Sequence, residues 1–402
     1  MKDHKKIRES VSRAYAIAVN EEKSCCGDAQ TKGVAARLAG YDKEDFQSVP
    51  IEAYENSFGC GNPLAFSGVK EGDVVLDPFC GRGTTNFAAR IVQLESLGID
   101  SSPVASAITA AKLVTSSSEE IVKEATRILQ TREAEDIPLD EFWKFAFHES
   151  VLESLCKFRE AFLEECVSEV QIALRGIILG ALHGPKQKSV QSYFSNQCPR
   201  TYAPKPAYAM RFWRERNLQP DPVDVLELIE RRANRYYNLP HYVLGSVRLG
   251  DCRSISVLKP EKSETRFRWI ITSPPYYGMR TYIPDQWLRN WFVGGPDCVD
   301  YSNRDQLQHS SPNAFAEDLR KVWRNIALVR TQDASLVIRF GGISDRRADP
   351  LKVIKSSLRN SGWKIKTIRK AGSSADGKRQ ADSFLKKRTS PLSEYDVWAR
   401  CE

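Results

Sequence analysis

The sequence predicts an α/β fold in which a mostly parallel sheet of seven strands is interrupted by a long, largely helical insertion. Three observations support this prediction. Short apolar runs alternate with helical stretches, an order typical of parallel sheets. The first two apolar runs each end in an acidic residue. The last two runs follow one another with no helix between them, which indicates an antiparallel hairpin.

The elements before residue 115 alternate between strand and helix. In chain order they are a strand at 73–77, a helix at 84–93, a strand at 96–100 and an alanine-rich helix at 104–114. The first strand ends at Asp77 and the second at Asp100. Because parallel strands end at the same edge of a sheet, both acids are expected beside a ligand crevice there.

The elements after residue 245 continue the alternation. They are strands at 246–249 and 267–272, a helix at 314–330, a strand at 334–340, a helix at 350–360, and strands at 363–369 and 394–400. The first of these helices places Phe315, Leu319, Val322, Trp323 and Ile326 on one side, as a helix packed on a sheet requires. The final pair of strands is expected to form the hairpin, with its turn at 371–391.

The insertion, residues 115–245, separates the second strand from the third. Helices are predicted within it at 117–132, 149–164, 168–182 and 223–238. Between the last two lies a stretch, 183–222, rich in proline, aromatic and basic residues, which we interpret as proline-held loops. Basic residues interleaved with aromatic ones favour contact with nucleic acid.

Composition narrows the class of protein. The chain of 402 residues has ten cysteines and no CxxC pair, which disfavours a disulfide scaffold or a zinc ribbon. It has neither a signal-peptide pattern nor an apolar run long enough to cross a membrane, so a cytoplasmic, nucleoid-associated protein is expected. Residues 339–388 carry a net charge of +11, whereas residues 1–114 carry −2. The basic stretch is either a solvated lysine-rich surface or a face for a polyanion.

The first chemical motif is Asp77-Pro-Phe-Cys-Gly-Arg-Gly-Thr-Thr. Gly81 and Gly83 allow a tight turn and close approach of a ligand to the backbone, and the helix that follows offers unpaired N–H groups. Asp100, nineteen residues after Gly81, is placed to accept the hydroxyls of a ribose. A nicotinamide dinucleotide is the rival ligand, but Asn86 replaces the third glycine of that fingerprint.

The second motif is Ser273-Pro-Pro-Tyr, at the end of the predicted strand 267–272. Two prolines fix the backbone and leave only carbonyl acceptors. The Ser273 hydroxyl and the Pro274 carbonyl can therefore hold both hydrogens of an exocyclic amine, while Tyr276 stacks on the ring that carries it.

On these residues the chain resembles the amino-methylating DNA methyltransferases, which act on cytosine N4 or adenine N6. The resemblance implies a seven-stranded Rossmann-like class I S-adenosylmethionine-dependent methyltransferase, with a catalytic domain at 60–114 and 246–402 and a target-recognition region at 115–245. The implied cofactor is S-adenosylmethionine. Its implied contacts are Asp77, Phe79, Gly81, Gly83, Thr84, Asp100 and Asp251, and the implied catalytic loop is Ser273, Pro274, Pro275 and Tyr276.

The implied partner is double-stranded DNA with the target base flipped out. A cognate restriction endonuclease, as in a restriction-modification system, is a further expected partner. Because Ser273 stands where an acid or amide is commoner in adenine enzymes, cytosine N4 is preferred and adenine N6 is the alternative. Methylation of RNA stays open, as do an arsenite or small-molecule methyltransferase and a nucleic-acid-binding module with a degenerate cofactor site. Expected contacts with nucleic acid are Lys186, Lys188, Tyr193, Arg200, Lys205, Arg211 and Arg214, with Phe194 and Asn196 near the flipped base. The alternative for this segment is a helical lid over the cofactor.

The first 75 residues resemble the N-terminal region of arsenite methyltransferases instead, in Ser24–Gly27, Leu38–Tyr41 and Gly59–Pro63. Residues 1–59 are expected to form a helical extension, with Asn62 and Pro63 near the methionine end of the cofactor. The resemblance raises a metalloid site at Cys25, Cys26 and Cys60, which Cys156, Cys166 or Cys198 could complete. We prefer to interpret these cysteines as small buried residues, and no metal site is predicted. His148, His183 and His241 are interpreted as structural or surface residues.

Overall fold

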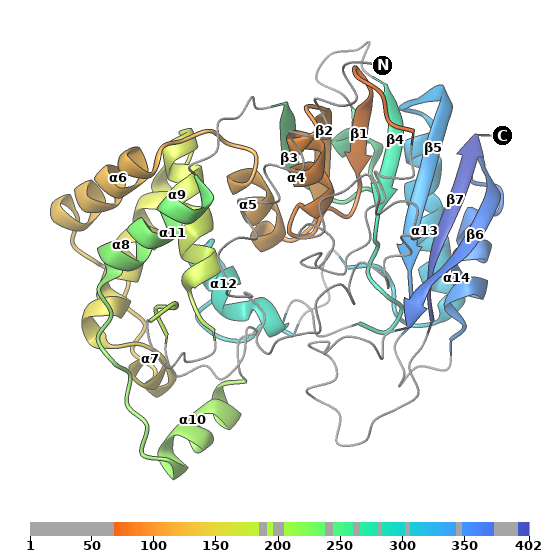
Figure 1. Ribbon diagram of the computed structural model, residues 1–402. Helices are drawn as coiled ribbons and strands as arrows, with labels where there is room; N and C mark the ends of the chain where they lie inside the picture. Colours follow the sequence, from red (N-terminus) through yellow and green to blue (C-terminus); the bar gives the residue numbers. More distant parts are fainter. Residues whose placement is uncertain are drawn as a thin grey trace.

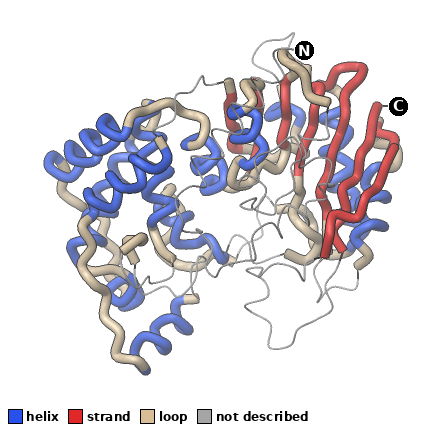
Figure 2. Tube along the Cα trace, in the orientation of Figure 1, coloured by secondary structure: helices blue, strands red, loops and turns tan. Residues whose placement is uncertain are grey.

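The computed structural model describes residues 68–184, 191–195, 205–237, 244–259, 266–279, 284–301, 306–342, 348–373 and 393–401 (Figure 1). The strands gather on one side of the molecule, and most helices of the insertion gather on the other (Figure 2). Among the helices in these ranges, none combines the length and the apolar character that crossing a bilayer requires.

The sheet has seven strands in the order β3-β2-β1-β4-β5-β7-β6. They are β1 (Val74–Asp77), β2 (Glu95–Asp100), β3 (Gly245–Leu249), β4 (Phe267–Thr272), β5 (Arg330–Phe340), β6 (Trp363–Ser373) and β7 (Ser393–Cys401). The first five are parallel, and β7 runs antiparallel to both β5 and β6. The predicted fold class, a Rossmann-like methyltransferase sheet closed by an antiparallel hairpin, is confirmed.

The parallel strands are joined by helices, as right-handed crossover connections require. These are α4 (Thr84–Ile91), α5 (Pro103–Ala111), α13 (Pro312–Ala327) and α14 (Pro350–Leu358). Three of them begin with proline at N1 after a side chain that caps the first turn, such as Ser311 before α13. The predicted side of α13 is buried, with Phe315 and Trp323 at 0% exposure.

The insertion has a hydrophobic core of its own, separate from the core beneath the sheet. Its helices are α6 (Ser118–Thr131), α7 (Glu141–Ala146), α8 (Glu149–Glu164), α9 (Glu169–Ala181), α10 (Pro206–Glu215) and α11 (Val225–Tyr236). Ser117 and Ser168 start α6 and α9 with complete capping boxes. The core is rich in aromatic rings, and Trp143 and Trp213 are almost fully buried within it.

A short helix that follows the Ser-Pro-Pro-Tyr loop completes the core of the insertion. This helix, α12 (Trp287–Phe292), comes after a 3-10 turn at Pro284–Gln286. The Trp291 ring lies 4.4 Å from that of Trp143 in α7. Arg159 of α8 donates from Nε to the Trp291 carbonyl at 3.0 Å. The helix that follows β4 in the chain is therefore packed within the core of the inserted helices.

Several elements differ from the sequence prediction. The stretch interpreted as proline-held loops contains α10, because Pro206 stands at the first helical position, where a missing N–H costs nothing. Helices α7 and α12 are only six residues long, too short for a periodic pattern to be recognised. The helix expected to reach residue 330 ends at Ala327, and β5 begins at Arg330 rather than 334.

Candidate active site

The two motifs lie side by side at the point where the strand order of the sheet reverses. Strands β2 and β3 lie on one side of β1, and β4 and β5 lie on the other. Leu76 of β1 pairs with Ile270 of β4. At the ends of these two strands, the Thr272 hydroxyl donates to Asp77 Oδ1 at 2.7 Å. Ligands of open α/β sheets bind at this reversal, outside the carboxyl ends of the strands.

The glycine loop is shaped by two residues in the left-handed region. Gly81 has φ +52° and Gly83 has φ +72°, conformations that favour glycine. A Cβ built on Gly81 would meet no atom within 4 Å, so this face of the loop is open. A Cβ on Gly83 would lie 2.7 Å from the Thr109 side chain, so that glycine is required by packing. Thr109 also donates to the Gly81 carbonyl at 3.0 Å.

Asp100 joins the glycine loop to the end of β2. Its Oδ2 accepts the Gly81 amide at 2.9 Å, and its Oδ1 accepts the Ser102 amide at 2.9 Å. Burial raises the pKa of Asp100, and the two amide hydrogen bonds oppose that shift. Each carboxylate oxygen has a second lone pair, so the same group can also accept hydroxyls from a ligand in the crevice.

Asp77 is a buried acid that braces the base of the loop. Besides Thr272, its Oδ1 accepts the Phe79 amide at 3.2 Å. Burial raises the pKa of Asp77 to about 6, although its hydrogen bonds favour the charged form. The side chain is 4% exposed. Asp77 therefore fixes the ends of β1 and β4, and its contact with a ligand stays a prediction.

Asn86 explains why the loop departs from the dinucleotide fingerprint. The side chain is fully buried and donates from Nδ2 to Ser96 Oγ at 3.1 Å. A Cβ on Gly98 would lie 2.7 Å from Asn86 Oδ1. The glycine that permits close packing of helix on strand is thus on β2, and the larger residue is on α4. Gly98 of β2 therefore provides the space that the third glycine of the fingerprint would provide on the helix.

The remaining predicted cofactor residues lie in three different environments. Thr84 is exposed at the first position of α4. Phe79 is partly buried and meets Trp323 of α13 edge-on, with centroids 6.2 Å apart. Both oxygens of Asp251 accept hydrogen bonds from the Arg253 guanidinium at 2.6–3.1 Å, and that guanidinium also contacts the buried Asp318. Asp251 is therefore already paired with a cation.

The Ser-Pro-Pro-Tyr loop presents its serine outward. Ser273 is exposed, Pro274 is buried, and Pro275 and Tyr276 are partly buried. The Tyr276 hydroxyl donates to Glu394 Oε1 of β7 at 2.9 Å, and its ring meets Phe340 of β5 edge-on at 5.6 Å. The Gly278 amide donates to His309 Nδ1 at 3.0 Å. The loop is held on both sides by the sheet and by the segment before α13.

Sequence reasoning missed four residues that shape this site: Thr109, Thr272, Cys252 and Glu394. Cys252 donates from Sγ to the Pro78 carbonyl at 3.1 Å and links the end of β3 to the glycine loop. Thr272 could have been found, because it is the polar end of an otherwise apolar strand next to Ser273. Glu394 could not, because it lies 118 positions after Tyr276 in the chain and only the antiparallel return of β7 brings the two together.

The expected nucleic-acid contacts are divided by the structure. Lys205, Arg211 and Arg214 lie on or just before α10 and are exposed. Tyr193 is partly buried beneath Arg232, whose guanidinium carbon lies 5.2 Å from its ring. Phe194 is 1% exposed in the core of the insertion, which contradicts its expected place beside a flipped base. The burial follows from its aromatic side chain, which packs among the inserted helices.

Other predicted residues lie outside the described part of the chain. These are Asn62, Pro63, Lys186, Lys188, Asn196, Arg200, His241 and the cysteines Cys25, Cys26, Cys60 and Cys198. Among the described cysteines, Cys156 is buried, and burial raises its thiol pKa to about 12. In the described ranges no three His, Cys, Asp or Glu side chains gather as metal ligands would.

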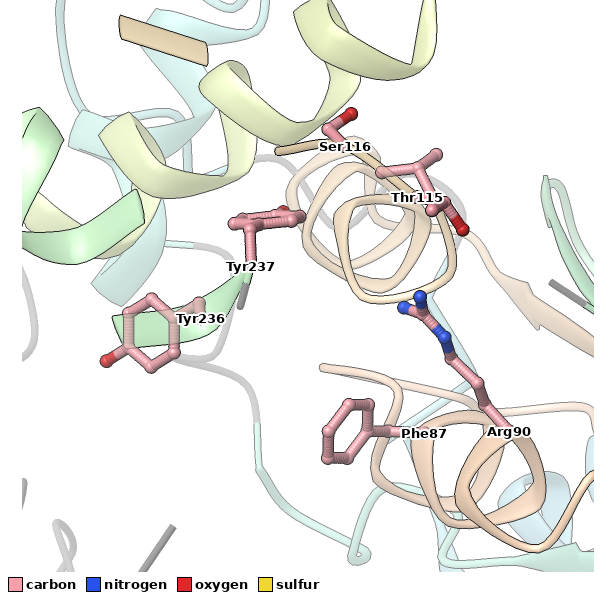
Figure 3. Close-up of a pocket in the computed structure, with 7 residues that line it drawn as sticks. Phe87, Arg90, Thr115, Ser116, Tyr236 and Tyr237 are labelled. Carbon is pink, nitrogen blue, oxygen red and sulfur yellow. The ribbon is translucent and has the colours of Figure 1, made fainter. Parts of the chain in front are cut away.

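A small cavity lies away from this site, where the sheet layer meets the insertion. Arg90 reaches from α4 toward Thr115 and Ser116, and Tyr237 lies across from it (Figure 3). Arg90 Nη1 donates to the Lys112 carbonyl, and the Tyr237 hydroxyl donates to the Ala111 carbonyl at 2.7 Å. The cavity measures about 20 Å³, room for one water molecule. These side chains cap the end of α5, and the cavity is too small for a cofactor.

The comparisons with known proteins agree with this geometry near the glycine loop. Residues 66–111 match the DNA methylase family. The match contains the glycine loop and Asp100, so the resemblance drawn from the first motif is confirmed over these residues. Ser273 lies beyond it.

A second similarity concerns a curated protein. The chain is 31% identical over 118 residues to the arsenite methyltransferase of Halobacterium salinarum. This covers 25% of the present chain, and the chain spans only 30% of the length of that relative. Among solved structures, the rRNA methyltransferase aviRa from Streptomyces viridochromogenes covers 96% of this chain and 92% of its own, at 13% identity and a TM-score of 0.31.

Proposed function

We propose that the protein transfers a methyl group from S-adenosylmethionine to an exocyclic amine of a base in DNA. The observation that carries the proposal is the position of Ser273. It is exposed at the end of β4, directly after the threonine whose hydroxyl holds Asp77 at the foot of the glycine loop. An acceptor for an amine and a cradle for a nucleoside cofactor therefore share one edge of the sheet. The DNA methylase match over 66–111 supports this proposal.

The residues at the end of β2 fit the proposed cofactor. The open face of Gly81 leaves room for a ligand against the backbone. The Asp100 carboxylate, anchored by two amides, has lone pairs left for the two hydroxyls of a ribose. Asp251 fits the proposed cofactor less simply, because the amine of the cofactor's adenine would have to share the carboxylate with Arg253. When bound, S-adenosylmethionine would supply an activated methyl group on a positively charged sulfur.

The chain's own task is then to position and activate the amine. The lone pair of an exocyclic amine is delocalised into its ring, which makes the nitrogen a poor nucleophile. Hydrogen bonds from the amine to the Ser273 hydroxyl and the Pro274 carbonyl would localise the lone pair and orient it. The target base must leave the duplex to reach Ser273, and Tyr276 would stack on its ring.

We favour cytosine N4 over adenine N6. Ser273 provides a neutral hydroxyl, which can accept one hydrogen bond from the amine and donate another to cytosine N3. Adenine N6 is the alternative, since the same loop could hold its amine. A cognate restriction endonuclease and association with the nucleoid belong to this proposal. The predicted division into a catalytic domain and the inserted region 115–245 accords with the separate hydrophobic core of the insertion.

A second candidate is a metalloid or other small-molecule methyltransferase, which the arsenite methyltransferase match favours. The buried, protonated thiols of Cys80 and Cys156 argue against those two as metalloid ligands. Labelled methyl transfer to DNA, RNA and arsenite in parallel separates these candidates. Digestion of the product DNA to nucleosides and mass spectrometry identify the base. N6-methyladenine without N4-methylcytosine would reverse our choice of base, and transfer to arsenite alone would reject the DNA proposal.

A further inference from the structure

One face of α10 carries two aromatic rings and two arginines, of which only Phe212 also packs against the core of the insertion. Tyr208 and Phe212 are four residues apart, so they lie on the same side of the helix. Their rings are stacked, with centroids 6.5 Å apart and planes at 26°. Tyr208 is 56% exposed. We call this face, made of Tyr208, Arg211, Phe212 and Arg216, the aromatic face of α10.

The opposite side of α10 already anchors the helix. Trp213 is fully buried and packs against Phe142 of α7 at 5.6 Å and Phe145 at 6.3 Å. Arg214 pairs with Glu141 of α7 and lies 5.9 Å from the Phe145 ring. Because Trp213 and Arg214 attach the helix and Phe212 packs only partly against the core, the exposed Tyr208 ring is left for another role.

The arginines of the aromatic face lie against its rings. The guanidinium carbon of Arg216 is 3.9 Å from the Phe212 ring centroid, and that of Arg211 is 5.9 Å from the Tyr208 centroid. Arg216 also pairs with Glu215 at 3.6 Å. A pocket of about 300 Å³ lies among Tyr208, Arg211, Phe212, Glu215 and Arg216. Arg216 covers part of the Phe212 ring, so the exposed Tyr208 ring is the more open of the two. An exposed ring with a second ring stacked on it and cations nearby suits a ligand that is both planar and anionic.

The charge of the helix favours a polyanion over the rest of this chain as the occupant. Residues 205–216 contain four basic residues and one acidic residue, a net charge of +3. The 67 residues that precede the described part have a net charge of only −1, so they do not complement it. Helix α10 also lies on the side toward which β1 and β4 run, the side of the candidate active site (Figure 1).

We propose that the aromatic face of α10 binds DNA by stacking an unpaired base on Tyr208 and Phe212 while Arg211 and Arg216 contact phosphates. The inference rests on the proposed function and deepens it, since an enzyme that flips a base leaves bases without their partners. Stacking on an aromatic ring is worth enough to change affinity severalfold for each base and requires no particular sequence.

Binding of the full chain to short fluorescent DNA, measured by anisotropy over a salt series, tests the inference. The probes are a single strand, a duplex with one mismatch and the fully paired duplex. The double variant Tyr208→Leu with Phe212→Leu removes the flat rings but keeps apolar bulk. It should weaken binding to the single strand and the mismatched duplex about fivefold or more, with an unchanged salt slope. Arg211→Gln with Arg216→Gln should instead reduce the salt slope by one to two, about one per phosphate contact.

Helix α11 offers matched controls. Tyr236 is 50% exposed, with Arg235 5.7 Å from its ring, and within the described ranges no second ring is stacked on it. Tyr236→Leu and Arg235→Gln should leave the affinity within about twofold of the original chain. Tyr208→Phe with Phe212→Tyr keeps both rings and should also bind normally, which separates loss of stacking from loss of folding.

The inference is wrong if the leucine variant binds like the original chain, or if the ring-retaining variant is weakened equally. A preference for an RNA strand of the same sequence, lost in the leucine variant, would replace DNA as the occupant. Methyl transfer by the unaltered chain is measured separately. If the protein methylates DNA but the α10 variants bind DNA like the original chain, only this inference is rejected. If the protein transfers no methyl group to DNA, the proposed function is rejected.

Discussion

Asp77 is an acid in a place where water does not reach it. Burial raises the pKa of its carboxyl group from 3.8, the ordinary value expected in an unfolded chain, to about 6 in the folded protein. The folded state therefore prefers the protonated form. The stability that this preference provides is fully present below pH 3.8 and is lost as the pH rises through 6, above which a buried carboxylate opposes folding.

Asp77→Asn should consequently stabilise the protein at pH 8 and have little effect near pH 4. Asparagine still accepts the Thr272 hydroxyl and the Phe79 amide, so the main change is removal of the buried charge. The gain at pH 8 should be at most about 3 kcal/mol. Urea unfolding across this pH range gives the profile, and Asp297→Asn at an exposed position serves as a control. A gain independent of pH would contradict the assignment.

Tyr276 and Glu394 form the second residue-scale prediction. Glu394→Ala removes the acceptor of the Tyr276 hydroxyl, and Tyr276→Phe removes its donor. If both act by orienting the ring, each should lower kcat/KM for DNA about three- to tenfold, and the double variant should be no worse than either single one. Glu394→Gln keeps an acceptor and should restore activity. Fluorescence of 2-aminopurine at the target position reports whether the flipped base is still held. Additive losses would show that the two residues act separately.

At this scale the sequence was informative where chemistry is local. Gly81, Gly83 and Asp100 were recognised because a strand, a turn and a second strand lie within 30 residues. The Asp100 carboxylate also accepts the Gly81 amide, a contact that the spacing did not predict. The prediction for Phe194 was wrong because the local sequence of an aromatic residue near basic ones is the same whether its ring faces solvent or a core. Burial is decided by the packing of distant helices, which no local pattern contains.

At the scale of elements, the contact between α4 and β2 depends on which residue is small. Gly98→Ala would put a methyl group 2.7 Å from Asn86 Oδ1, with little room to move in a closed interface. We expect a loss of about 1–3 kcal/mol in the free energy of unfolding. Adding Asn86→Ala should recover much of that loss, because the methyl then fills the space of the amide.

Urea unfolding of the two single variants and the double variant measures this coupling. Gly180→Ala is the matched control, since its added methyl would meet only Arg232 at 3.6 Å and the site is helical. That change should be neutral or stabilising by up to about 1 kcal/mol. If Gly98→Ala lowers the free energy of unfolding by the same amount in the original chain and in the Asn86→Ala variant, the contact does not limit packing.

The long elements were predictable from periodicity, and the short ones were not. Helix α13 and strand β4 present uniform buried sides, so their existence followed from the spacing of apolar residues. The six-residue helices α7 and α12 are stabilised by contacts between their aromatic side chains, including those between Trp143 and Trp291. These contacts join residues about 150 positions apart in the chain, so they leave no trace in either local pattern.

For the whole molecule, Arg289 is a buried polar link between the helix that follows the Ser-Pro-Pro-Tyr loop and the insertion. The side chain is 5% exposed. It donates to the Leu179 carbonyl at 2.9 Å, to His183 Nε2 at 2.9 Å and to Gln286 Oε1 at 3.1 Å. Arg289→Met keeps the apolar stem and leaves these acceptors without their donor. We expect a loss of about 2–4 kcal/mol in the free energy of unfolding.

Unfolding followed by tryptophan fluorescence is a direct measurement, because Trp287 and Trp291 lie on the same helix as Arg289 and both contact Trp143. Arg127→Met, which breaks an exposed pair with Glu124, should cost no more than about 0.5 kcal/mol. Similar small costs for both variants would show that the aromatic contacts alone join the two parts.

The burial of α12 also has a consequence for synthesis on the ribosome. The inserted helices are complete once residue 236 has emerged, but the side chains that fill the middle of their core belong to Trp287–Phe292. Some fifty further residues, including all of β4, must be translated before that core can close. Until then we expect the aromatic rings of α7 to lack their partners from α12 in the nascent chain. The packing of the insertion and the anchoring of the segment that follows the Ser-Pro-Pro-Tyr loop are therefore expected to be completed together.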